Sequence, residues 1–351
     1  MKRFVTLALC FILALSLSIC AFAAGIDNDP STDPNYGKDA QFIDEATISI
    51  PVEYKLTNGT SVSPAETFNF TIAKYSCTDS LYTLDTMPAF SPASFSVAFA
   101  EGEATTDGDI NYAVVTLPEY QYVGIYTYAI NQTAGNTAGV TYDDTTVYLK
   151  VTAIEQNGVV RVVATYYGEN PASKGAMFVN EYSAAPITIS KTVTGNMGEQ
   201  SRYFAIKINL TNPAGKTAPA RYAITAGTSY TDQITEIVAG EDNTVYLKHN
   251  ETLTIENVPY GVTYTVVEDD YTAAPYSYDA AEYTGSDVTN NTVNGLMDAA
   301  DENVMITNNK GTDVDTGVAL TSLPYIFTAL ASLGGGAVVF ATRKRKSKAE
   351  N

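Results

Sequence analysis

Short segments in which apolar and polar residues alternate recur along most of the chain. Residues 68–72, 126–130 and 147–151 are examples, and in each an apolar or aromatic side chain stands at every second position. A period of two is typical of antiparallel strands with one buried face, and no long amphipathic helix is evident. Asp107-Gly108 and Asn157-Gly158 supply turns between such segments. The pattern predicts an all-β protein made of sandwiches.

The strand pattern occurs twice. Three landmarks recur in the same order, and the pairs are 48–52 with 187–191, 126–132 with 264–268, and 178–180 with 306–308. Counted between the last residues of the landmarks, the first and second lie 80 residues apart in one half (52 to 132) and 77 in the other (191 to 268). The second and third lie 48 and 40 residues apart. Self-similarity of this kind indicates a repeated structural unit.

We therefore predict two tandem Ig-like β-sandwich domains, at residues 40–184 and 185–311. About 290 residues remain after processing of the ends, which is enough for two substantial cores. Residues 183–186 would form a short linker, and such a linker implies end-to-end domains with limited swing. Residues 25–39 are mostly Asp, Asn, Pro, Ser and Gly, so we expect a flexible arm there.

The N-terminus has the features of an export signal. Lys2 and Arg3 precede an uncharged, largely apolar run, and small residues stand before Ala24, so residues 1–24 are predicted to be a cleaved signal peptide. Cys20 leaves a lipoprotein as the alternative, although Ser18-Ile19 does not fit the small residues expected before a lipidated cysteine. Removal of the signal leaves only Cys77, so no disulfide can form within one mature chain.

Residues 312–351 predict a membrane anchor that is processed. Residues 318–342 carry no charge and end in a Lys/Arg cluster, which is typical of a span followed by a cytoplasmic tail. Together with Thr316-Gly317 this order resembles the cell-wall sorting signal of Gram-positive surface proteins. The resemblance implies that a sortase cuts between Thr316 and Gly317. The match is partial, because Asp313-Val314-Asp315 replaces the usual proline-containing motif, and an ordinary single-pass anchor is the alternative.

Composition excludes several classes of function. The chain has 20 Lys and Arg against 39 Asp and Glu; without the seven basic residues of the two ends and Glu350, 13 remain against 38, a net charge near −25. This acidity argues against a nucleic-acid partner. A single histidine excludes a histidine-based metal cluster, and no calcium-loop spacing surrounds Asp107, Asp143-Asp144 or Asp269-Asp270. We expect no metal and no cofactor.

Three polar side chains lie on apolar strand faces in the second half. By strand parity, Lys191 shares a face with Ile189 and Val193, and Glu268 and Asn308 also share faces with apolar neighbours. Burying the three separately would be costly, so we expect them to meet. Burial favours a neutral amine and a protonated carboxyl. The amine of Lys191 could then attack the Asn308 side chain, with Glu268 as proton shuttle, and leave an isopeptide bond.

With these residues the chain resembles the isopeptide-linked domains of streptococcal-type major pilins. Their motif has a Lys on the first strand, a Glu closing a Tyr-x-Val-x-Glu strand and an Asn on the last strand. In the first half, the equivalent positions are Val52, Gln132 and Asn180, so both nucleophile and shuttle are absent. Lys55 has the opposite parity to Val52 and should face solvent, unless the register slips after Pro51.

The resemblance also implies a lysine that accepts the neighbouring subunit. Lys174, six residues before Asn180 in a loop-like stretch, is the candidate, and Lys150 is its rival. The partners implied are sortase, further copies of the chain, minor pilins and peptidoglycan. The expected function is a non-enzymatic pilus shaft subunit, secreted and displayed on the cell wall of a Gram-positive bacterium. A monomeric anchored adhesin or stalk is the alternative, and a secreted hydrolase with paired carboxylates is a third reading.

Overall fold

The protein is described by a computed structural model, which covers residues 47–168, 175–299 and 302–312. Every regular element in these residues is a β-strand. The first nine are β1 (Thr47–Leu56), β2 (Glu66–Thr78), β3 (Ser94–Phe99), β4 (Asp109–Thr116), β5 (Gly124–Thr133), β6 (Val140–Thr141), β7 (Thr146–Gln156), β8 (Val159–Tyr167) and β9 (Phe178–Tyr182). The alternating segments of the first half fall within β1, β2, β5, β7 and β9 as the period of two predicts.

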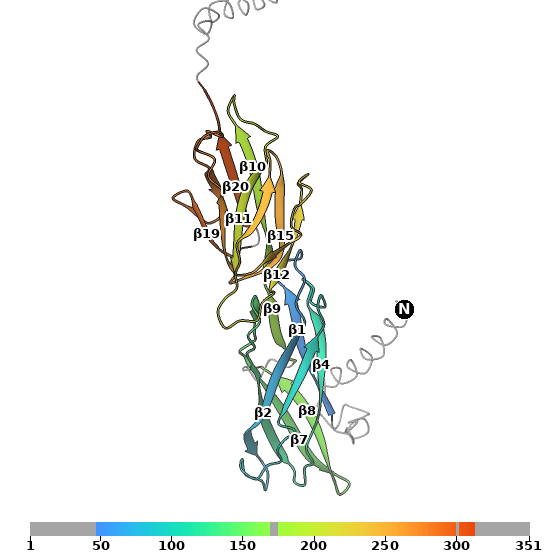
Figure 1. The fold of residues 1–351 in the computed structure, drawn as a ribbon. Helices are drawn as coiled ribbons and strands as arrows, with labels where there is room; N and C mark the ends of the chain where they lie inside the picture. The colour runs from blue at the N-terminus through green and yellow to red at the C-terminus, as the bar shows by residue number, and fades with distance from the viewer. Residues whose placement is uncertain (1–46, 169–174, 300–301, 313–351) are drawn as a thin grey trace, which may run out of the picture.

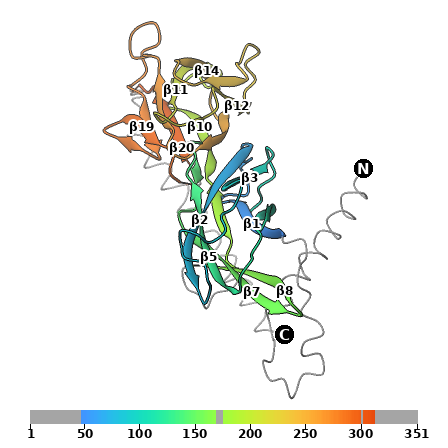
Figure 2. The same cartoon turned by 90° about the horizontal axis from the view of Figure 1, so that it is seen from below.

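The second half adds eleven strands. They are β10 (Ala184–Thr194), β11 (Phe204–Thr211), β12 (Arg221–Ala226), β13 (Glu236–Val238), β14 (Asn243–Leu247), β15 (Thr252–Pro259), β16 (Thr263–Glu268), β17 (Glu282–Gly285), β18 (Val288–Thr289), β19 (Thr292–Leu296) and β20 (Glu302–Asn309). The all-β class and the two tandem sandwiches predicted from the sequence are confirmed. Figure 1 shows the two sandwiches end to end, and Figure 2 shows them turned by 90°.

Each half packs two sheets face to face. The first half pairs a sheet of order β4-β1-β9-β6 with one of order β3-β2-β5-β7-β8. The second half pairs β13-β12-β15-β10-β20-β17 with β14-β11-β16-β19-β18. In both halves the first strand lies parallel to the last, since β1 pairs with β9 and β10 with β20. Because these pairs are parallel, the chain enters each domain at one pole and leaves it at the other.

Two large cores fill the sandwiches, and the boundary between them falls between two adjacent residues. Val193, Phe204 and Tyr278 form a small third cluster in the second domain. Ala184 packs in the first core and Ala185 in the second. Alternation along β1 and β10 places their apolar side chains inward, as in the fully buried Ile50, Val52 and Ile189. Each inner face therefore contributes one layer of the core, which is the packing that a sandwich of two sheets requires.

No free linker separates the two domains, which differs from the segment expected at residues 183–186. Strand β9 ends at Tyr182 and β10 begins at Ala184, so only Ser183 lies between strands. Its N–H donates to Gly139 O at 2.8 Å, and its carbonyl accepts from Tyr260 N at 3.0 Å. The backbone N–H of Ser183 is thus satisfied by the first domain and its carbonyl by the second, which holds this residue from both sides.

Further hydrogen bonds cross the joint. The Asn257 side chain accepts from Val62 N at 3.0 Å and donates to Val62 O at 2.8 Å. On a second loop, Ala138 N donates to Thr217 O and Thr217 N donates to Asn136 O, both at 2.8 Å. These bonds tie loops from both domains, so the end-to-end arrangement is built into the fold.

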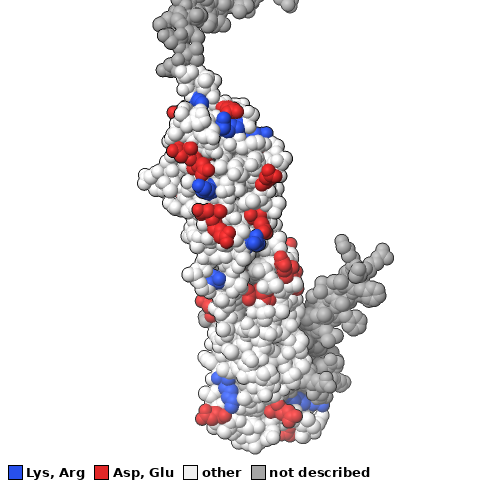
Figure 3. All heavy atoms as spheres, in the orientation of Figure 1, with Lys and Arg blue, Asp and Glu red and all other residues white. Residues whose placement is uncertain are grey.

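The visible surface carries mixed charge. Figure 3 shows acidic and basic side chains in interspersed groups along both domains. The surface also carries ion pairs between exposed residues, such as Lys207 with Asp269 at 2.9 Å. This face offers no concentrated basic patch of the kind that binds nucleic acid.

Candidate functional site

The structure brings Lys191, Glu268 and Asn308 together in the second domain. Lys191 lies on β10 opposite Ile306 of the parallel strand β20, and Asn308 follows two residues later on the same inward face. Glu268 ends β16 in the facing sheet. The Lys191 Nζ lies 2.6 Å from Asn308 Oδ1 and 3.2 Å from Glu268 Oε1. The site therefore spans both sheets of one sandwich.

The three side chains are enclosed. Lys191 and Asn308 are each 1% exposed and Glu268 is 7% exposed. The Phe204 ring lies 4.4 Å from the Lys191 Nζ, and the rings of Tyr271 and Tyr278 pack edge-on against Phe204. An aromatic wall excludes water and strengthens the electrostatic interactions within it.

Burial changes the acidity of both ionisable groups. It lowers the pKa of the Lys191 ammonium to about 8, against the opposing effect of the Glu268 carboxylate. It also raises the pKa of the Glu268 carboxyl, because desolvation outweighs the attraction of Lys191. Both shifts favour transfer of a proton from the amine to the carboxyl, which leaves a neutral, nucleophilic amine.

Two contributors to the site were not found from the sequence. One is Phe204, and the other is Tyr283 on the edge strand β17. The N–H of Glu268 donates to the Tyr283 hydroxyl at 2.8 Å, at a point where the pairing of β16 with β19 has already ended. Tyr283 thus fixes the strand end that carries Glu268. Alternating patterns contain many aromatic residues, so no local signal distinguishes these two.

The first domain holds the equivalent positions in the same geometry but with different groups. Val52 lies opposite Phe178, and Asn180 follows two residues later, which reproduces the register of Lys191 and Asn308. The Gln132 side chain donates to Asn180 Oδ1 at 2.5 Å and accepts from Asn180 Nδ2 at 3.2 Å. Asp143 N also donates to Asn180 Oδ1, at 3.1 Å. The buried asparagine is therefore satisfied by amides, with no amine present.

Lys55 lies outside the first core. Its Nζ pairs with Glu181 at 2.9 Å, and the two side chains are 34% and 39% exposed. The β1–β9 register continues without a slip from Val52 to Leu56, so Lys55 keeps the outward parity expected of it. The neighbouring Glu181 raises the pKa of the Lys55 ammonium, which opposes nucleophilic behaviour.

Most of the other predicted sites lie outside the residues that the structure describes, and Lys150 is the exception. Lys174, Thr316 and Gly317 fall outside the described residues, as do the signal peptide, the arm and the span at 318–342. Lys150 lies on the outer face of β7, half-buried, between Thr127 and Thr165 of the flanking strands.

Two kinds of feature are absent from the described residues. Within residues 47–168, 175–299 and 302–312, no helix is long and apolar enough to cross a membrane. The same residues contain no cluster of three or more His, Cys, Asp or Glu side chains suited to a metal ion. Among the aspartates considered as calcium ligands, Asp143 instead accepts hydrogen bonds from Thr145 and from Val179 N.

Comparison with known families divides the chain at the same place as its cores. Residues 50–183 match the family described as a Spy0128-like isopeptide containing domain. Residues 185–310 match a domain of unknown function, DUF7601. The family named for the isopeptide bond thus matches the half that lacks the lysine and the glutamate. The complete trio lies in the half whose family has no described function.

Similar proteins come from Streptococcus pyogenes. A curated pilin of serotype M1 is 28% identical over 254 residues, which cover 69% of this chain and 73% of that protein. The crystal structure of the major pilin from this species is 20% identical, with a TM-score of 0.53, and covers 77% of this chain and 100% of the other. The major pilin T3.2 of serotype GAS13637 gives 18% identity, a TM-score of 0.50 and coverages of 77% and 100%. The resemblance of this chain to streptococcal major pilins, indicated by its sequence, is thereby confirmed.

Proposed function

We propose that this protein is the shaft subunit of a sortase-assembled pilus and that its second domain carries an autocatalytic isopeptide bond between Lys191 and Asn308. The observation that carries the bond is the enclosed contact of the Lys191 Nζ with Asn308 Oδ1 at 2.6 Å, beside Glu268. Similarity to pilins over both domains supports the shaft role. The protein acts as a structural polymer, and the only chemistry it performs is on itself.

The bond forms by exchange of one amide for another. Glu268 takes a proton from the Lys191 ammonium, and the neutral Nζ attacks Cγ of Asn308. Glu268 then gives this proton to the Asn308 Nδ2 and takes the second proton from the Nζ, the Cγ–Nδ2 bond breaks, and ammonia leaves with Glu268 protonated. The C–N bond that replaces it joins β10 to β20. Positioning supplies much of the rate, because the amine is already held against the carbonyl that it attacks.

Polymerisation would be a separate, intermolecular reaction. In our proposal, sortase cuts after Thr316 and passes the Thr316 carbonyl to a lysine amine of the next copy, with Lys174 as the first candidate and Lys150 as the second. The last copy would be joined to peptidoglycan, and minor pilins would be added by the same chemistry. The protein would then stand on the cell surface of a Gram-positive bacterium.

Two measurements test the proposal. The purified mature protein should weigh one ammonia less than its sequence, and the loss should disappear in Glu268→Ala. Cell-wall extracts should contain a ladder of SDS-resistant multimers that Lys174→Ala abolishes, with Lys150→Ala as the comparison. A monomer without a ladder would favour the anchored adhesin or stalk, and an unchanged mass in the native protein would reject the isopeptide bond.

A further inference from the structure

The turn that joins β14 to β15 lies against the backbone of Lys191. Regular pairing of β10 with β15 ends at Ser190. Beyond it, Lys191 N donates to Glu251 O at 3.0 Å, and Asn250 N donates to Lys191 O at 2.8 Å. Val193 N donates to His249 Nδ1 at 3.0 Å. The turn therefore holds β10 on one side while β20, with Asn308, holds it on the other.

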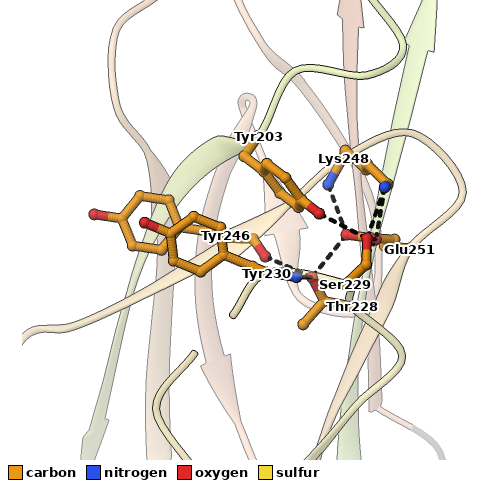
Figure 4. Close-up of polar contacts among 7 residues, drawn as sticks. All are labelled: Tyr203, Thr228, Ser229, Tyr230, Tyr246, Lys248 and Glu251. Carbon is orange, nitrogen blue, oxygen red and sulfur yellow. Dashed lines mark hydrogen bonds and ion pairs between the residues drawn. The ribbon is translucent and has the colours of Figure 1, made fainter. Parts of the chain in front are cut away.

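The carboxylate of Glu251 fastens this turn. Its Oε2 accepts from Thr228 Oγ1 at 2.8 Å and from Lys248 N at 3.1 Å. Its Oε1 accepts from the N–H and the hydroxyl of Ser229, both at 3.0 Å, and lies 3.6 Å from Lys248 Nζ. Figure 4 shows these contacts converging on the carboxylate. Glu251 is only 7% exposed. Its carboxylate is fixed in position because several directional bonds act on it at once.

The hydrogen bonds to Glu251 keep its carboxylate ionised. Burial alone would raise the pKa of the carboxyl, but the hydrogen bonds from Ser229, Lys248 and Thr228 outweigh it and keep the pKa below its ordinary value. The group is therefore an ionised, four-fold hydrogen-bonded anchor. An ionised acceptor makes stronger bonds to these donors than a neutral one would.

A second path leads from the same cluster to the reacting amine. Lys248 Nζ donates to Ser229 Oγ at 2.7 Å, and the same oxygen lies 2.6 Å from the Tyr203 hydroxyl. Tyr203 directly precedes Phe204, whose ring faces the Lys191 Nζ. Figure 4 shows the Tyr203 hydroxyl pointing toward Ser229 and Glu251. The cluster thus touches the backbone of Lys191 and the segment that carries its aromatic wall.

The first domain provides an internal contrast. There Val52, the equivalent of Lys191, lies within the regular β1–β4 ladder opposite Asn111, and the ladder continues to Tyr54. A turn replaces the ladder at this position only in the domain with the complete trio. The contrast links the turn to the chemistry rather than to the fold that both domains share.

We infer that Glu251 is a positioning residue for the isopeptide reaction, acting through the turn that it anchors. It touches neither reacting group. It fixes the backbone from which the long, flexible Lys191 side chain reaches Asn308, and a displacement of about 1 Å is enough to slow such a reaction on the order of 100-fold. The inference rests on the proposed function, since it requires that the Lys191–Asn308 bond forms.

The test follows ammonia loss over time in the full mature chain, made by cell-free synthesis and sampled by intact-mass measurement. Glu251→Gln should slow the loss at least about tenfold relative to the native chain. Glu236→Gln is the matched control, because Glu236 is an exposed carboxylate in the same domain, paired with Arg221, and it should react at the native rate. Thr228→Val, which deletes one donor to Glu251, should fall between the two.

Folding is checked separately in a background that cannot react. Circular dichroism of the Glu268→Ala chain, with and without Glu251→Gln, identifies a temperature at which both are folded, and rates are compared there. A native rate in both Glu251→Gln and Thr228→Val, while the native chain loses its ammonia, would overturn the inference. If Glu251→Gln does not fold, Thr228→Val decides alone. A native chain that loses no ammonia would reject the proposed function itself, and the inference with it.

Discussion

The two domains share a topology and a register, yet their buried polar sites differ in kind. In both, the last strand lies parallel to the first and places an asparagine, Asn180 or Asn308, at the same inward position. The second domain sets a lysine and a glutamate against its asparagine, while the first sets a valine and a glutamine. The fold therefore does not require the trio of lysine, glutamate and asparagine, but it does require that the asparagine be satisfied.

The difference also shows that the lysine and the glutamate are coupled. A buried lysine without its carboxylate leaves an unpaired charge, and a buried carboxylate without its lysine does the same. The first domain lacks both, and the glutamine at position 132 forms a reciprocal amide pair with Asn180. A neutral pair of amides satisfies the buried groups without a charge, so the two replacements are compatible only together.

Loss of the bond should have the largest effect, and only on the second domain. Glu268→Ala should keep the full mass and lower the free energy of unfolding of this domain by about 5 kcal/mol, because a loop closed across a separation of 117 residues is opened. Lys191 also remains buried without its carboxylate partner. Calorimetry should show the second-domain transition falling toward, or below, that of the first.

The double variant Lys191→Met with Glu268→Gln is the control for this experiment. It also prevents the bond, but it leaves neither a buried amine nor a buried carboxylate, so it should destabilise the second domain less than Glu268→Ala does. Equal effects would mean that the covalent bond alone accounts for the loss. An unchanged transition in both variants would contradict the comparison of the two domains.

Restoring the trio in the first domain tests the comparison in the other direction. The double variant Val52→Lys with Gln132→Glu should lose a second ammonia, because the register already places Asn180 as Asn308 is placed. A bond there would stabilise the first domain by up to about 5 kcal/mol. Val52→Lys alone should instead destabilise it. A folded double variant with a single ammonia lost would show that the register is not sufficient, and would point to the turn at Glu251 as the missing part.

The pH dependence of a bond-free second domain gives a smaller effect. In Asn308→Ala the Lys191 amine stays free, with a folded-state pKa near 8 against an ordinary value of 10.5. The unfolded chain binds more protons within this window, so the free energy of unfolding should rise as the pH increases from about 8 to 10.5, by on the order of 3 kcal/mol. Denaturant titrations across the window measure it, and the native, bonded chain should lack the rise.

Lys55→Ala should have the smallest effect. This lysine is on the outer face and its partner Glu181 is exposed, so neither the number of ammonias lost nor the unfolding midpoint of the first domain should change. Intact-mass measurement and thermal unfolding check this. If the Lys55→Ala chain retains an ammonia that the native chain loses, then Lys55 reacts, and the first domain is not the unreactive one.

Strand parity was enough to predict which side chains of the site face inward. The period of two is a local property, since successive side chains of a strand point to opposite faces, and it placed Lys191, Glu268 and Asn308 on inner faces and Lys55 on an outer one. The same reasoning, applied to the repeat, identified Val52 and Gln132 as the equivalents that lack the amine and the carboxyl. The all-β class and the tandem sandwiches followed from the same alternation.

Only the tertiary structure decided how these faces meet. The parallel pairing of β10 with β20 joins residues more than a hundred positions apart, and nothing in a local pattern encodes it. The same holds for the joint between the domains. Ser183 stands where a linker was expected, and it is held by hydrogen bonds to residues distant in the sequence. Phe204 and Tyr283 reach the site from a facing sheet and an edge strand, and the turn that contains Glu251 contacts the backbone of Lys191. Side-chain parity is fixed by neighbouring residues, whereas a site is fixed by contacts between distant ones, and these exist only once the chain has folded.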